Sequence, residues 1–224
     1  MRSRFNYHDF LAYVFPGLLL CLITILVVFA RGHYRLFALI QTFGGFLLLL
    51  LFAYLVGQVL QAVGAWFEKK VFFPHGYHPG EAFFRQKSGL LQPRDFERLL
   101  AKYKEHFGVE LTTEELEDPR RREECFHQVR WGIKGEARAE YLTTLDGYYD
   151  LWRGLFVSFI LCALVTIPIA WGILLVPLKL TFYKKIFMII WVASIIGIYI
   201  SARRTQDYMH TYTKEVVNGF LGDK

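Results

Sequence analysis

Several polar residues in this chain have types and spacings that could do chemistry. His75, His78 and Glu81 stand three residues apart, and two imidazoles with a carboxylate are a ligand set that zinc accepts. The segment around them is rich in Pro and Gly, where spacing in sequence does not fix the geometry of the ligands. We therefore predict an interfacial loop and no metal site. A hydrolase built on His75 and His78 remains an alternative.

Arg122 and His127 form an R-x4-H pair, which resembles the ribonuclease motif of HEPN domains. The resemblance covers these two residues and implies a membrane-anchored nuclease as an alternative function, although Glu123 stands where that family usually carries a smaller polar residue. Arg122 also ends the run Arg120, Arg121, Arg122, which is followed by two glutamates. This pattern is typical of a solvated helix face, and the three arginines are our candidates for contact with a partner protein or an anionic ligand.

A third polar pattern lies in the apolar run 36–67. Small residues there recur at spacings that place them on one helix face, and polar residues lie on or beside it: Ala53, Tyr54, Gly57, Gln58, Gln61 and Gly64. Small residues let helix backbones approach, and glutamine amides bond between helices in the absence of water. The pattern predicts packing within one chain, contact between copies, or a pore lined by Gln58 and Gln61 of several subunits.

The elements that must position these residues are mostly apolar helices. Residues 10–30, 36–67, 155–178 and 186–202 contain no Asp, Glu, Lys or Arg, and each is long enough to cross, or nearly cross, a hydrocarbon core ~30 Å thick. The second run would be about 48 Å long as one helix. We predict an all-α polytopic membrane protein with four transmembrane helices. Because the runs hold no acid or base, ion-coupled transport is disfavoured, and a small facilitative transporter remains an alternative.

A polar segment separates the second run from the third. It predicts a helix from Pro93 that ends at Gly108, and another that starts at Asp118 and Pro119 and continues to Gly135. An apolar stripe over residues 137–152 then leads into the third run. We therefore divide the chain into residues 1–67, a cytoplasmic helical domain at 68–154, residues 155–202, and a C-terminal cytoplasmic helix at 203–224.

The distribution of charge indicates location and partners. The net charge is +6, but the polar segment is nearly neutral, and the excess of basic residues lies at the borders of the apolar runs. Such charges suit lipid headgroups, so we expect the bilayer as a partner and no nucleic acid. The three cysteines do not form an even framework, which fits a reducing compartment. The positive-inside rule then favours both termini and the polar segment in the cytoplasm, and we expect the membrane to be a bacterial inner membrane.

Residues 148–155 read Tyr-Tyr-Asp-Leu-Trp-Arg-Gly-Leu and lead into the third run. With paired runs before and after, the chain resembles small four-span bacterial membrane proteins of uncharacterised function, some of which are encoded beside phage-defence genes. The resemblance implies a role in defence but no active site. We predict a non-enzymatic, self-associating membrane sensor, effector or pore, without cofactor or metal, whose cytoplasmic domain receives a signal or binds a protein partner.

Overall fold

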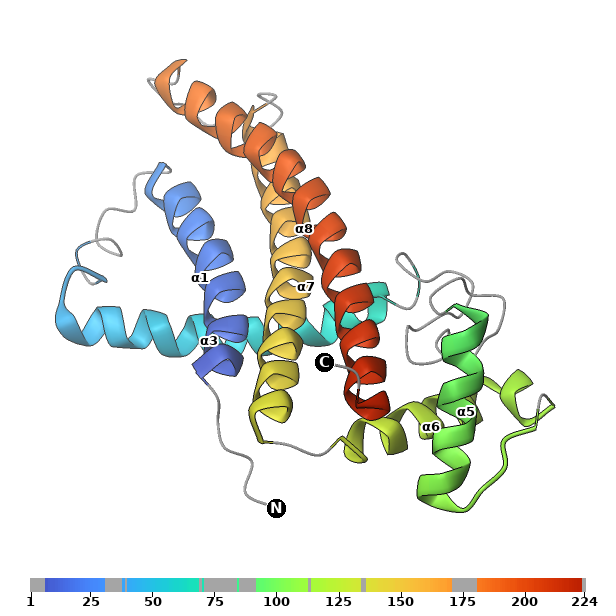
Figure 1. Ribbon diagram of the computed structural model, residues 1–224. Coiled ribbons are helices and arrows are strands. Elements are labelled where there is room, and N and C mark those ends of the chain that lie inside the picture. The colour runs from blue at the N-terminus through green and yellow to red at the C-terminus, as the bar shows by residue number, and fades with distance from the viewer. Residues whose placement is uncertain are drawn as a thin grey trace. The chain divides into compact units, whose positions relative to one another are not determined.

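The computed structural model describes residues 7–30, 38, 40–68, 70, 84, 92–112, 114–133, 136–170 and 181–222. These residues form helices and no strand, as Figure 1 shows. Their order is α1 (Tyr7–Ala30), α3 (Phe43–Phe67), α5 (Pro93–Phe107), the 3-10 turn η2 (Glu115–Glu117), α6 (Pro119–Trp131), α7 (Glu136–Ala170) and α8 (Thr181–Leu221). The helices α1, α3, α7 and α8 are long and apolar enough to cross a membrane. The all-α class and the presence of four candidate spans are thus confirmed.

The chain divides into two compact units. The first, here called the span unit, comprises residues 1–67 and 147–205, and the second, here called the polar unit, comprises residues 68–146 and 206–224. Both α7 and α8 are continuous helices that contribute residues to each unit. The segment 203–221 is therefore the last part of α8.

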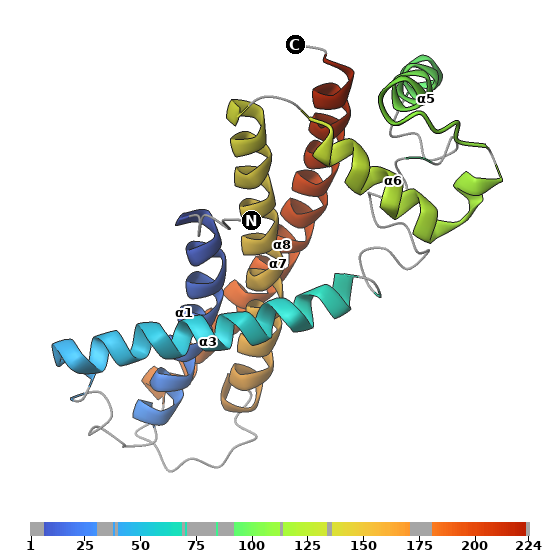
Figure 2. The ribbon, with the colours of Figure 1, turned by 90° about the horizontal axis from the view of Figure 1, so that it is seen from below.

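Within the span unit, α3 crosses α1 and α7, as the two views in Figures 1 and 2 agree. Two glycines bring the backbones of α1 and α3 together. A Cβ at Gly57 would overlap the Tyr13 carbonyl, and a Cβ at Gly17 would overlap the Ala53 carbonyl. Since any larger residue would separate the helices, these positions fix where α1 and α3 meet. α7 and α8 lie side by side, and Gly197 of α8 packs against the Phe159 ring of α7.

The second apolar run is not one helix from end to end. A turn at Gln41 and Thr42 interrupts it, and α3 begins at Phe43. The Thr42 hydroxyl oxygen accepts a hydrogen bond from the Gly45 amide at 3.0 Å, which satisfies one of the amides that a helix start leaves unpaired. The 25 residues of α3 extend over about 38 Å, less than the 48 Å expected for the whole run.

The polar unit confirms two predicted helix starts. α5 begins at Pro93 and ends at Gly108, whose φ of 69° is the left-handed conformation that glycine adopts readily. α6 begins at Pro119, where Asp118 accepts from the Arg120 amide at 3.0 Å. It ends at Trp131, before the expected Gly135, because the Gly132 amide turns back to the carbonyls of the last turn. The core includes Phe96, Leu99, Tyr103, Cys125, Val129, Tyr212 and Val216.

Candidate functional site

Three helices of the span unit meet at the side chain of Gln61. Its amide nitrogen donates to the Ala12 carbonyl of α1 at 3.1 Å and to the Asp150 carbonyl of α7 at 2.5 Å. Its oxygen accepts from Nε of Arg153 at 3.1 Å. Gln61 is only 5% exposed. We call Ala12, Pro16, Gln61, Asp150 and Arg153 the polar node.

Pro16 explains why a polar side chain is required at this place. In a regular helix the Ala12 carbonyl would accept a hydrogen bond from the amide of residue 16, but proline has no amide hydrogen. Gln61 supplies the missing donor from α3. The carbonyl of Pro16 itself accepts from the Ser158 hydroxyl of α7 at 2.8 Å. α1 therefore keeps its helical course through Pro16 with hydrogen bonds from two neighbouring helices.

Arg153 brings a positive charge to the node, and Asp150 balances it. The two side chains form an ion pair at 2.7 Å between Nη2 and Oδ1. The guanidinium carbon also lies 5.2 Å from the centre of the Tyr149 ring, a cation–π distance. Gly64 leaves room for this side chain, since a Cβ there would lie 2.9 Å from Cγ of Arg153. The arginine is thus held by α3 and by its own helix.

The structure separates the two glutamines that the sequence places near one face. Gln61 shares the buried face of α3 with Ala53, Gly57 and Gly64. Gln58 is exposed. Tyr54 stacks on Phe10 at 6.0 Å between ring centres and meets Tyr13 edge-on at 5.8 Å. Ala53, Gly57, Gly64 and Gln61 therefore serve contacts within the chain, whereas Gln58 lies on the outer surface of α3.

The three arginines of α6 also have different surroundings. Arg122 is 5% exposed, and its Nη1 donates to the carbonyls of Leu116 at 2.6 Å and Glu117 at 2.9 Å, which holds η2 against α6. Arg121 pairs with Glu124 at 3.1 Å. Arg120 is exposed. Arg120 and Arg121 are therefore the members of this run that a partner could reach.

The R-x4-H pair does not converge. Arg122 is buried against η2, whereas His127 is exposed and lies 4.0 Å from Glu123. Residues five apart on a helix point in different directions. His75, His78 and Glu81 lie outside the described residues. Within the described part of the chain, no three His, Cys, Asp or Glu residues gather as a metal site would require.

Two features were not predicted from the sequence, one in the polar node and one in the polar unit. The first is the Asp150–Arg153 pair, which an i, i+3 spacing of opposite charges at the start of an apolar run could have indicated. The second is a capping box ahead of η2: Glu115 accepts from the Thr112 amide at 3.0 Å, and the Glu115 amide donates to the Thr112 hydroxyl at 3.3 Å. The Thr-x-x-Glu spacing is the usual signature of this motif. The hydrogen bond from the Thr112 amide lowers the pKa of Glu115.

A comparison of the chain with protein-family models, curated proteins and solved structures found no match.

Proposed function

We propose that this chain is an integral membrane protein whose polar unit receives a signal or binds a protein partner in the cytoplasm, and whose spans respond. The observation that carries the proposal is the unbroken course of α7 from Glu136 to Ala170. In the polar unit, Asp146 of α7 pairs with Arg130 of α6 at 2.8 Å. One helical turn further along, Asp150 belongs to the polar node. A partner that displaces α6 would act on the same helix that Gln61 holds.

Self-association of the spans is the response that we favour. α3 presents an outer surface of exposed apolar residues, among them Leu51, Leu55 and Ala62, with Gln58 on the same face. Within the described residues, the structure gives the Gln58 side chain no hydrogen-bond partner. An amide in hydrocarbon gains when it bonds to a second amide, which a second copy of α3 would supply. The output would be a change in membrane permeability or the recruitment of a soluble partner.

The test uses the two glutamines as a matched pair in the full chain. Gln58→Leu should reduce the mass of the complex in detergent and leave thermal stability unchanged, because this side chain is exposed and has no hydrogen-bond partner within the described residues. Gln61→Leu should lower thermal stability, because the hydrogen bonds of Gln61 lie within the chain. Arg120→Glu with Arg121→Glu should release any protein that co-purifies with the wild type. A monomeric wild type without a bound protein would contradict the proposal.

A further inference from the structure

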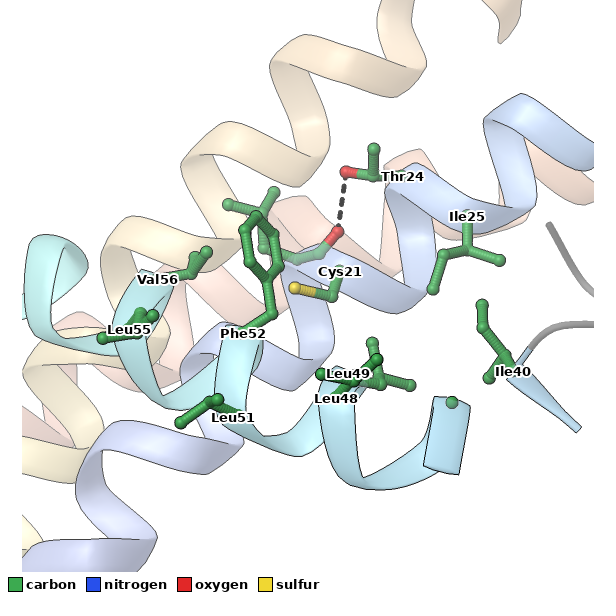
Figure 3. A pocket seen from close by; sticks show the side chains of 12 residues that line it. Cys21, Thr24, Ile25, Ile40, Leu48, Leu49, Leu51, Phe52, Leu55 and Val56 are labelled. Carbon is green, nitrogen blue, oxygen red and sulfur yellow. Dashed lines mark hydrogen bonds between the residues drawn. The ribbon is translucent and has the colours of Figure 1, made fainter. Parts of the chain in front are cut away.

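A pocket of about 610 Å³ lies between α1 and α3. Its walls come from Leu20 to Ile25 of α1, from Gly45 to Val56 of α3, and from Ile40. The two helices are in contact where Gly57 lies against Tyr13 and Gly17 lies against Ala53. Because the helices cross at this point, they diverge on either side of it. The pocket fills the angle between the last part of α1 and the first part of α3, as Figure 3 shows.

The lining of this pocket is suited to hydrocarbon and not to water. Among the described residues that line it, the only polar side chains are Thr24 and Cys21. The Thr24 hydroxyl already donates to the Leu20 carbonyl at 2.8 Å, and Cys21 is buried. A water molecule needs two to four polar partners to be stable in a cavity. The pocket offers too few, and both helices that form it are candidate spans, so its surroundings are apolar.

The shape of the rim favours a thin, flexible occupant over another helix. Leu48, Phe52 and Leu55 stand exposed along the α3 side, whereas close contacts between membrane helices use small residues. Two small residues of α3 that could admit another helix are already engaged, Gly57 by α1 and Gly64 by α7. The α3 wall from Gly45 to Val56 is roughly 16 Å long, which is about half of a ~30 Å hydrocarbon core and so matches the reach of a chain from one leaflet.

We propose that this pocket binds one acyl chain of a membrane phospholipid. The inference goes beyond the proposed signalling role and shares with it only the insertion of α1 and α3 into the bilayer. The chain would lie against Cys21 and Leu49 and be covered in part by Phe52. Lipid bound in this way would brace α1 and α3 beyond the point where glycine brings them together.

The experiment places the full chain in phosphatidylethanolamine vesicles that contain a trace of the same lipid with a diazirine in one acyl chain. After irradiation, the adducts are located by peptide mass spectrometry. We expect adducts at Cys21, Leu49 and Phe52 to be several-fold more abundant than at Ile189 and Ile196, which are exposed on α8. Leu49→Trp should fill the pocket and lower the Cys21 adduct several-fold. Ile196→Trp, the matched control, should leave it unchanged.

The remaining outcomes overturn the proposal in distinguishable ways. Equal adduct density in the pocket and on α8 would mean that the pocket is contacted by bulk lipid only. This comparison needs the wild-type protein and no variant. A disulfide that forms between two chains carrying Leu48→Cys when an oxidant is added would identify a second copy as the occupant. Adducts on α8 with none in the pocket would remove this inference and leave the membrane role standing. No adduct on any span would overturn both.

Discussion

Pro16 and Gln61 form a pair at the scale of single residues, although they lie on different helices. Proline is tolerated in membrane helices where neighbours bond to the backbone group that it leaves unpaired, and Gln61 does this for the Ala12 carbonyl. The same amide reaches the Asp150 carbonyl and accepts from Arg153. Both ends of the side chain are therefore in use, which explains why neither leucine nor glutamate could replace it without loss.

Gln61→Leu should lower the free energy of unfolding by about 1–3 kcal/mol, the usual cost of leaving buried polar groups unpaired. The cost should shrink by about 1 kcal/mol in a Pro16→Ala background, because alanine restores an amide that can bond the Ala12 carbonyl. The measurement is a double-mutant cycle of unfolding in detergent. Gln58→Leu serves as the control and should change little. Additive effects of Pro16→Ala and Gln61→Leu would show that the two residues are not coupled.

Cys125 and Tyr103 give the polar unit a dependence on pH. Burial raises the pKa of the Cys125 thiol, and burial together with a hydrogen bond to Cys125 raises the pKa of Tyr103. Both are acids that the folded state keeps neutral. Their contribution to stability is complete below the unfolded pKa values of ~8.5 and ~10, and it is lost as pH rises toward the folded values.

In the full chain, the urea concentration at which Cys125 becomes half alkylated should therefore decrease as the pH is raised from 8 to 10.5. Tyr103→Phe removes the tyrosine contribution, so its curve should be flatter than that of the wild type in the upper half of this range. A midpoint independent of pH would mean that neither group is more acidic in the unfolded chain.

At the scale of elements, local signals predicted the helices of the polar unit well. Proline at the first helical position and glycine after the last gave the bounds of α5, and Asp118 followed by Pro119 gave the start of α6. The interruption at Gln41 and Thr42 was not predicted, because the run stays uncharged through these two residues and only the Thr42 cap marks the start of α3. The sequence did not predict that α1 and α3 cross. A small residue indicates that another helix packs closely, but it does not show which helix.

Gly57→Leu should destabilise the span unit at or above the ~1–3 kcal/mol typical of overpacked cores. The reason is that its side chain would meet the Tyr13 carbonyl, and a backbone cannot turn aside as a side chain can. Gly44→Leu is the matched control on the same helix, because a Cβ at Gly44 would meet nothing within 4 Å. Thermal unfolding of both variants in detergent checks this. Equal stability of the two would show that the helices do not touch at Gly57.

At the scale of the whole molecule, composition determined the class of protein and little else. Long apolar runs predict spans whatever their packing, so four candidate spans were accessible from the sequence. The sequence did not show that Gln61 is buried and Gln58 exposed. A small rotation of α3 about its axis decides whether a glutamine amide contacts α7 or lies on the outer surface. Burial of Arg122 was equally hidden, since its two carbonyl partners belong to a turn that composition does not distinguish from solvated loop.

The orientation of the chain is a prediction at this largest scale. The Lys/Arg balance favours a cytoplasmic polar unit, so we expect a cysteine at an exposed position of α5 to resist membrane-impermeant thiol reagents in intact cells. Glu105 is suited to this purpose, because it is exposed whereas Gly108 has a left-handed backbone that disfavours substitution. Gly32→Cys, between the first two apolar runs, should be labelled.

The native cysteines allow this test without a large background, since Cys21, Cys125 and Cys162 are all buried. Permeabilised cells should label Glu105→Cys fully, which shows that the position itself is reactive. The two cysteines lie on opposite sides of the membrane in our proposal, so one must change its labelling on permeabilisation and the other must not. Labelling of Glu105→Cys in intact cells, with Gly32→Cys protected, would reverse the orientation and remove the cytoplasm as the source of the signal.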